Sequence, residues 1–574
     1  MTVSIKLRPL GVFASSTIVC AILASCGGSD QDTVIRLNPN RAPFPLVEAT
    51  IAGMHAAMKQ GQLSCRDVVQ GYIARINAYD KEPSAAFPAS PALRSVIAIN
   101  PNALAEADKL DAAFFGSQNF TGPMHCVPVL AKDNFDTFDM KTTAGSLALA
   151  NNQPPDDAYT IRKIRAAGAI ILGKANLDEY AFGFVGRSAV GGQAKNAYDP
   201  TKGPGGSSSG TGTSIAANFA MVGLGTDTGG SVRVPSALEA LVGIRPSLRL
   251  VSQDGIVPLA HAQDTAGPMC RTVEDCAVLL DAMVGFDPST GSGQRAAKIY
   301  NAPLFPNAGA YAAATKVPTT YTTSLRADGL RGARIGVVRS MFPAATAANQ
   351  PFLDALNTAL TEMAAAGAVL QDIDIDDRTT VLGYPSLSGY EFKDNLTEYL
   401  LSWPSTGDGH PRSYDEVSTL LSTLEPTFVN SFEGYRANGT NKESKPAYLT
   451  YTSGERDNVV ITRVTKALGN NGGTPFDVLV YPVLQGLNTA VGSSPNSGSN
   501  NRLSPYSGFP AMTIVAGFAT PVGATTPAQP VGLEMLAREF DEPTLFKIGY
   551  GWQQTAKKRR PPTTAPELMA APQG

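Results

Sequence analysis

The stretch that decides the fold is GPGGSSSGTGTSIAANFAMVGLGTDTGGSVRVPS, residues 203–236. It begins with a glycine- and serine-rich loop around Ser207, continues through an apolar run at 215–224, and ends in a second small-residue loop at 225–233. The apolar run is long enough for a buried helix and a returning segment. Glycine permits positive φ angles and close backbone approach. The stretch therefore predicts two tight loops held against a hydrophobic core.

Two other interpretations of this stretch fit less well. A flexible linker is rich in glycine and serine throughout, whereas this stretch carries core residues such as Phe219 and Leu224. A phosphate-binding loop ends in Gly-Lys-Ser or Gly-Lys-Thr, and no such end occurs here. The two loops suit acyl transfer instead, because that chemistry needs a hydroxyl nucleophile beside backbone N–H donors that hold an oxyanion.

A lysine follows an apolar run well before these loops. Residues 127–134 read VPVLAKDN, and the run ends at Lys132. Lysine is rarely buried without a reason. The alternative is a surface lysine paired with Asp133, but the position after a strand-like run favours burial.

These segments together resemble the amidase signature family. In that family a lysine acts with two serines, and the matching positions here are Lys132, Ser207 and Ser231, with the two serines 24 residues apart (231 − 207 = 24). The resemblance covers roughly residues 45–558 and is nearest to bacterial exported peptide amidases. It implies that Ser231 is the nucleophile, that Ser207 relays the proton, and that Lys132 is the base.

The resemblance also assigns roles around the second loop. It implies an oxyanion hole made by the backbone N–H groups of Thr228, Gly229, Gly230 and Ser231. Ser208 would support the loops, and Asp227 and Arg233 would pair beside them. This chemistry requires neither a metal nor an organic cofactor.

The expected fold class is α/β, the amidase signature fold, with a large mixed central sheet covered by helices on both faces. Helix-like patterns followed by apolar strand-like runs recur at 156–174 and 352–373. Such alternation indicates a mixed or parallel sheet. We expect one catalytic domain over residues 45–558, with a surface excursion at 287–328 and a lid or rim at 403–457.

Both ends of the chain are predicted to lie outside this domain. Residues 1–26 combine Lys6 and Arg8 with a short apolar run and end at Leu-Ala-Ser-Cys, which resembles a lipoprotein signal with Cys26 as the lipidated residue. A generic cleavable secretion signal is the alternative. Residues 27–44 are expected to be a linker and 559–574 a flexible tail. The sequence thus predicts a periplasmic, membrane-anchored protein.

Composition limits the remaining functions. With 43% hydrophobic and 17% charged residues and a net charge of −3, the chain suits a globular enzyme and not a nucleic-acid binder. Cys65, Cys126, Cys270 and Cys276 do not form a disulfide framework by spacing. Cys270 and Cys276 could pair, although Cys276 falls in a helical pattern and is expected to pack as a small hydrophobe. The four histidines have no metal-like spacing, and a histidine base remains the alternative to Lys132.

The predicted function is amide hydrolysis through an acyl-enzyme, with C-terminal peptide amides as the leading substrates. Aryl amides, carbamates and esters share the same route. The competing interpretations are a non-catalytic binding lipoprotein and a glutamine amidotransferase subunit. The sequence does not determine the oligomeric state.

Overall fold

The computed structural model of the protein describes residues 35–288, 305–402, 410–525 and 527–568. The predictions for the signal segment and Cys26 fall outside these residues, as does part of the predicted linker. Within the described parts of the chain, no helix is both long and apolar enough to cross a bilayer.

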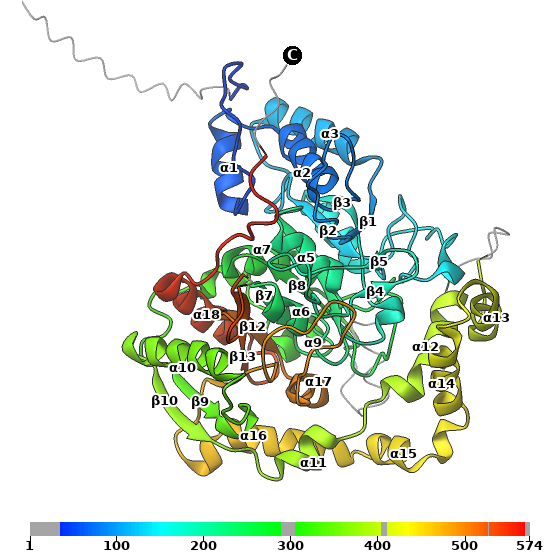
Figure 1. Ribbon diagram of the computed structural model, residues 1–574, viewed down its shortest axis with the longest axis vertical. Coiled ribbons are helices and arrows are strands. Elements are labelled where there is room, and N and C mark those ends of the chain that lie inside the picture. Colours follow the sequence, from blue (N-terminus) through cyan, green and yellow to red (C-terminus); the bar gives the residue numbers. More distant parts are fainter. Residues whose placement is uncertain (1–34, 289–304, 403–409, 526, 569–574) are drawn as a thin grey trace, which may run out of the picture.

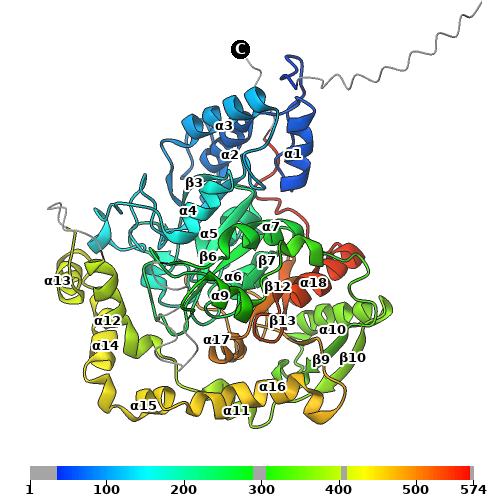
Figure 2. The same ribbon diagram turned by 180° about the vertical axis from the view of Figure 1, so that it is seen from behind.

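A mixed sheet runs through the centre of the molecule, and helices flank it (Figures 1 and 2). Its eleven strands within the described residues lie in the order β1-β3-β2-β6-β8-β7-β12-β13-β11-β9-β10. The predicted fold class is confirmed. The strands are β1 (Val96–Ile99), β2 (Pro128–Lys132), β3 (Ile170–Ala175), β6 (Val222–Asp227), β7 (Val242–Arg245), β8 (Thr265–Cys270), β9 (Arg334–Val338), β10 (Val369–Ile373), β11 (Val478–Tyr481), β12 (Ala511–Ala519) and β13 (Gln529–Leu536), and a separate hairpin pairs β4 (Arg187–Ser188) with β5 (Gly192–Gln193).

The pairing of β2 with β6 places the predicted site. These strands run parallel, with Ala131 opposite Leu224. Parallel neighbours end at the same edge of a sheet, so Lys132 at the end of β2 and Asp227 at the end of β6 come out side by side. Both strands are buried along their whole length, which explains their continuous apolar sequences.

Helices connect and cover the strands. The segment predicted from 203–236 forms α5 behind the first glycine loop, then β6, then α6 behind the second loop. The α-helices are α1 (Ile51–Lys59), α2 (Cys65–Tyr79), α3 (Ala103–Ser117), α4 (Tyr159–Ala166), α5 (Ser209–Ala216), α6 (Arg233–Leu238), α7 (Val273–Met283), α9 (Ala308–Thr315), α10 (Gln350–Ala365), α11 (Arg378–Gly383), α12 (Ser388–Leu401), α13 (Tyr414–Leu424), α14 (Val429–Gly439), α15 (Pro446–Thr452), α16 (Thr462–Leu468), α17 (Leu503–Ser507) and α18 (Glu542–Ala556).

Residues 378–402 and 410–452 form a helical band, α11–α15, outside the sheet (Figures 1 and 2). An aromatic cluster joins this band to the body of the protein. Tyr180 packs against Phe392 and Phe432 with ring centroids 5.7 and 5.4 Å apart, and Phe182 stacks on Tyr435 at 4.1 Å. Aromatic pairs at these separations contribute beyond the area they bury. As far as it is described, the region predicted as a lid or rim is therefore helical, and it is anchored to the body at Tyr180 and Phe182.

The ends of the domain differ from the predicted linker and tail. Arg41, inside the predicted linker, makes an ion pair with Asp67 of α2. The tail expected from residue 559 packs on the body as far as it is described. Arg559 forms an ion pair with Glu48, and the buried Arg75 of α2 donates to the carbonyls of Ala565 and Pro566. The partners of Lys558 and Arg559 are Glu362 and Glu48, which lie so far away in the sequence that the pairing could not be predicted from it.

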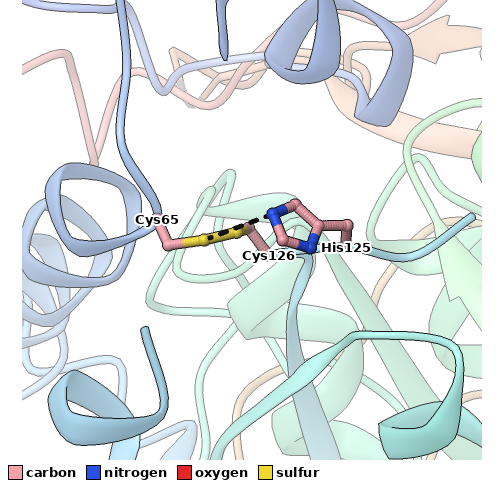
Figure 3. A group of neighbouring side chains, drawn as sticks. All are labelled: Cys65, His125 and Cys126. Atoms are coloured by element: carbon pink, nitrogen blue, oxygen red, sulfur yellow. Dashed lines mark hydrogen bonds between the residues drawn. A yellow bond between two sulfur atoms is a disulfide. The ribbon is translucent and has the colours of Figure 1, made fainter. Parts of the chain in front are cut away.

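The four cysteines of the domain form two disulfides, Cys65–Cys126 and Cys270–Cys276, with Cα atoms 5.2 and 5.6 Å apart. Cys276 is thus bonded and does not simply pack as a hydrophobe. His125 lies beside the first disulfide, with its Nε2 3.9 Å from Cys65 Sγ (Figure 3). Burial lowers the pKa of His125 to about 4. Cysteine binds metals as the thiolate. Because Cys65 and Cys126 are joined in a disulfide, the group formed by Cys65, His125 and Cys126 offers no thiolate ligand.

Candidate active site

Lys132 lies completely buried at the end of β2 and reaches the first glycine loop. Its Nζ is 2.8 Å from Ser207 Oγ and 2.8 Å from Thr226 Oγ1, with the Thr226 carbonyl at 3.5 Å. Asn134 Nδ2 donates to the same threonine hydroxyl at 3.1 Å. The lysine and the first serine of the prediction therefore meet directly, and Lys132 is not a surface residue.

Burial lowers the pKa of Lys132 to about 7, although Asp178, Asp227 and Asp264 act in the opposite direction. A neutral amine has two N–H donors and one lone pair. The Thr226 carbonyl can only accept, so it takes one donor, and the Thr226 hydroxyl is placed to take the other. With both N–H groups used in this way, the lone pair of a neutral amine would face the Ser207 hydroxyl, whose Oγ lies 2.8 Å from Nζ. Such an arrangement is chemically able to pass a proton from Ser207 to neutral Lys132.

The second loop lies against the first. The backbone N–H of Ser208 donates to the carbonyl of Ser231 at 3.1 Å, and the Ser208 hydroxyl donates to the Thr226 carbonyl at 3.3 Å. The supporting role predicted for Ser208 is thus seen as two bonds that join the loops. Ser231 is 4% exposed, and its hydroxyl makes no hydrogen bond to another described residue.

The predicted oxyanion donors are not equivalent. The N–H of Gly230 donates to Asp227 Oδ1 at 2.7 Å and is therefore already used in this structure. The N–H groups of Thr228, Gly229 and Ser231 donate to no other described residue. A Cβ placed on Gly229 would meet nothing within 4 Å. Unpaired donors beside open space can bind an oxygen atom that carries negative charge.

A buried charge network holds the second loop from behind. Asp227 accepts from Arg233 Nε at 3.0 Å and from the N–H groups of Gly230 and Val232. Arg233 also donates to both carboxylate oxygens of Glu534, at 2.7 and 2.8 Å. The predicted pairing of Asp227 with Arg233 is present, and it extends to β13. Burial alone would raise the pKa of Asp227, but the guanidinium groups of Arg233 and Arg245 hold this pKa below its usual value.

Two further carboxyl groups border the site. Asp178 accepts the N–H groups of Val185 and Gly186, and burial raises its pKa to about 7. Asp264 accepts from the Thr228 hydroxyl at 2.5 Å, and burial raises its pKa to about 6. Both act on Lys132 electrostatically. Neither Asp178 nor Asp264 is among the site residues predicted from the sequence.

A small cavity lies beside these groups and has room for about one water molecule. Asn134, Thr226, Thr228, Asp264 and His261 all contribute to its wall. The Oδ1 atom of Asn134 is buried without a hydrogen-bond partner in the protein. Sequence analysis missed Asn134 and Thr226, although Asn134 lies only two residues beyond the predicted base.

A mixed sheet with a buried lysine-serine pair beside free backbone donors is typical of an enzyme of α/β fold that hydrolyses amides. The Amidase family model matches residues 67–546. The chain therefore belongs to the amidase signature family, as the resemblance in the sequence indicated.

Individual relatives agree with this family. A probable amidase of Arabidopsis thaliana is 30% identical over 94% of this chain and 95% of its own. A glutamyl-tRNA(Gln) amidotransferase subunit of Alkaliphilus metalliredigens is also 30% identical, over 88% of this chain and 96% of its own. Among solved structures, the native peptide amidase of Stenotrophomonas maltophilia is similar, with a TM-score of 0.74 and 32% identity over 91% of this chain and all of that one.

Proposed function

We propose that the protein hydrolyses the C-terminal amides of peptides through an acyl-enzyme on Ser231. The observation that carries this proposal is the fully buried contact between Lys132 Nζ and Ser207 Oγ beside the second loop. Similarity to the Stenotrophomonas peptide amidase supports the choice of substrate. An amide needs an activated nucleophile, an oxyanion hole and a proton for the leaving nitrogen, and the site offers a candidate group for each.

In the acylation step, neutral Lys132 takes the proton of Ser207 while Ser207 takes the proton of Ser231. The oxygen of Ser231 then forms a bond to the amide carbon, and the carbonyl oxygen becomes an oxyanion. The free N–H groups of Thr228, Gly229 and Ser231 stabilise that charge. Each such donor typically contributes about 3 kcal/mol to the transition state.

Collapse of the tetrahedral intermediate breaks the carbon–nitrogen bond. The proton held by Lys132 returns through Ser207 to the departing nitrogen, which leaves as ammonia when the substrate is a primary amide. Water then attacks the ester carbon of the acyl-enzyme and loses its proton through Ser207 to Lys132. The second tetrahedral intermediate collapses, the bond between this carbon and Ser231 Oγ breaks, and the proton returns from Lys132 through Ser207 to Ser231. The carboxylic acid is released, and Lys132 is neutral again.

The test compares wild type with Lys132→Ala and Ser231→Ala on a peptide amide and on a peptide anilide. We expect turnover by wild type and loss of nearly all activity in both variants. Ser214→Ala, in α5, removes another buried serine hydroxyl and is the matched control. If Lys132→Ala keeps wild-type kcat, the base assignment is wrong. If wild type is inert on both amides but a fluorophosphonate labels Ser231, only the substrate is wrong.

An amidotransferase-like function is the second candidate, because a relative of comparable identity is itself part of an amidotransferase. That function would deliver ammonia to an acceptor and would depend on a partner protein. Release of free ammonia by the purified chain, without ATP or tRNA, would favour the hydrolase. Activity that appears only with an added acceptor system would favour the amidotransferase.

We also propose that the chain is exported and anchored through lipid on Cys26. The signal-like residues 1–26 support this, and so do the two disulfides, which persist mainly in oxidising compartments. Mass spectrometry of the mature N-terminus should find a lipidated Cys26 in the membrane fraction. Cys26→Ser should move the protein out of that fraction, and unprocessed cytoplasmic protein would contradict the proposal.

A further inference from the structure

Gln263 lies just before β8, is fully buried, and makes hydrogen bonds in two directions. Its Nε2 donates to the carbonyl of Thr228 at 3.3 Å. Its Oε1 accepts from the N–H of Leu387 at 2.6 Å and from the Ser386 hydroxyl at 3.1 Å. Leu387 and Ser386 belong to the helical band, immediately before α12. One side chain thus bridges the second glycine loop to the band.

The bond to Thr228 has a geometric consequence for its neighbour. In a trans peptide unit the C=O and the N–H point in opposite directions. Gln263 holds the Thr228 carbonyl, so the Gly229 N–H of the same unit points away from Gln263. This N–H is one of the unpaired donors, and Gly229 borders open space.

The following peptide unit is held on both sides. Asn501 Nδ2 donates to the carbonyl of Gly229, and the Gly230 N–H donates to Asp227. The peptide unit between Gly229 and Gly230 is therefore fixed. The Gly229 N–H belongs to the preceding unit, between Thr228 and Gly229, and Gln263 is the side chain that orients that unit. A donor held in place before the reaction stabilises an oxyanion without reorganising.

We propose that Gln263 is a positioning residue that directs the Gly229 N–H toward the oxyanion. Because Gln263 also bonds to Ser386 and Leu387, this direction depends on the position of the helical band. The proposal rests on the proposed function. Gln263 itself has no contact with the reacting atoms. Its loss should affect the transition state and leave the binding of the ground state nearly unchanged.

Two substitutions separate the two sets of bonds. Gln263→Met removes both, whereas Gln263→Glu keeps an acceptor for Leu387 and, when ionised, loses the donor to Thr228. We expect kcat to fall roughly 10- to 100-fold in both variants, less than the complete loss of a donor, with KM close to wild type. The affinity of a peptide aldehyde, which forms an oxyanion on the nucleophile, should fall by the same factor as kcat.

A pH series provides the readout that a general structural defect would not change. The carboxyl introduced by Gln263→Glu can donate to the Thr228 carbonyl only when protonated. The ratio of kcat in Gln263→Glu to kcat in Gln263→Met should therefore rise as the pH falls. Dividing one variant by the other cancels the titration of Lys132.

Gln529→Met, at another buried glutamine at the start of β13, is the matched control and should keep wild-type kcat. An activated aryl ester serves as a second substrate, so that a wrong amide substrate does not hide the effect on acylation. Wild-type kcat in Gln263→Met would overturn the proposal. The proposal would also be overturned if the ratio of kcat in Gln263→Glu to kcat in Gln263→Met did not change with pH. A loss of kcat that equals the loss of folded protein would overturn it as well.

Discussion

Lys132 can serve as a base only because its surroundings make its positive charge unfavourable. The side chain is fully buried, and burial lowers its pKa to about 7. The neighbouring Thr226 carbonyl and hydroxyl orient the amine without supplying a negative charge. A carboxylate in direct contact would favour the ammonium form. The nearby carboxyl groups of Asp178 and Asp264 form their hydrogen bonds elsewhere.

The first prediction follows from this protonation state. Because neutral Lys132 is the active form, kcat/KM should rise with pH through a midpoint near 7, where Lys132 loses its proton. Initial rates on a peptide amide from about pH 5 to about pH 9 measure this dependence. A rate that is flat over this range, or that falls with rising pH, would contradict the role of Lys132.

The second prediction concerns stability. The folded-state pKa of Lys132 is depressed to about 7 from an ordinary value of 10.5. Between these values the unfolded chain binds a proton that the folded chain has lost, so this residue's contribution to stability rises with pH across the window. Lys132→Met should therefore be more stable than wild type near pH 7, and its advantage should shrink toward pH 10.

Denaturation midpoints of both proteins at several pH values measure this advantage. Other titrating groups are common to the two proteins and largely cancel in the difference. Lys109→Met, at an exposed lysine of α3, controls for the substitution itself. An advantage that grows with pH would show that the folded protein holds Lys132 protonated.

The residues of the site differ in how visible they are in the sequence. Lys132 could be predicted because a strand pattern ends at it, and Ser207 because glycine surrounds it. Thr226 and Asn134 could not, since a polar residue at a strand end has many ordinary roles. The use of the Gly230 N–H by Asp227 depends on a side-chain rotamer, which no sequence pattern specifies.

At the scale of elements, the loop between β6 and α6 depends on the buried pair of Asp227 and Arg233. Both side chains are fully buried, and each also satisfies backbone groups. Breaking one partner of such a pair leaves an uncompensated buried charge. The loop is thus held by a network that has little tolerance for losing one member.

The third prediction is that Arg233→Met lowers the free energy of unfolding by about 3–5 kcal/mol, because Glu534 would lose its buried cation and Asp227 would keep only Arg245. Chemical denaturation followed by fluorescence measures this change. Arg66→Met, which breaks an exposed ion pair with Asp108 on α3, is the control and should cost about 0–1 kcal/mol. A small change in Arg233→Met would mean that water enters this site.

The two disulfides link elements that the sequence treats as unrelated. Cys65 opens α2 and Cys126 precedes β2, so this bridge ties the N-terminal helices to the strand that carries Lys132. Their separation of 61 residues hid the pairing, because spacing reveals disulfides only in compact cysteine-rich chains. Cys270 and Cys276, six residues apart, were visible as a pair, but the helical pattern argued against it.

The fourth prediction compares the two bridges. In the chain-entropy model a bridge across 61 residues contributes about 4 kcal/mol and one across six residues about 2 kcal/mol. Replacing Cys65 and Cys126 by alanine should therefore destabilise the protein more than replacing Cys270 and Cys276. Peptide mapping without reductant verifies the pairing, and equal losses from both replacements would contradict the entropic account.

At the scale of the whole molecule, the sequence predicted the central sheet well, but it predicted the helical band and the C-terminal segment poorly. Buried strands such as β2 and β3 are mostly apolar runs, and the expected helix between them is present as α4. The helical band, by contrast, is amphipathic and polar, so its sequence resembles a variable surface region. Its attachment to the body depends on Tyr180 and Phe182, whose partners lie more than 200 residues away.

The contacts of the C-terminal segment are also made with residues far away in the sequence, and they are the basis of the last prediction. Arg75 of α2 is buried, and two of its acceptors are the carbonyls of Ala565 and Pro566. A chain that stops after Lys558 loses these acceptors and the Arg559 partner of Glu48. We expect it to be about 3–5 kcal/mol less stable, because buried charges lose their partners. A chain that stops after residue 568 keeps every one of these contacts and should match wild type.

A second substitution identifies the cause of this loss. Arg75→Met should destabilise the full chain, since the tail carbonyls then lose their donor. In the chain that stops after Lys558 the same change should restore part of the stability, because it removes a buried guanidinium that keeps only its bonds to Ala217 and Asn218. Denaturation of the four proteins forms a double-mutant cycle between helix α2 and the tail. Additive losses would mean that the tail stabilises the domain through apolar packing instead, and a truncation without effect would restore the flexible tail that the sequence indicated.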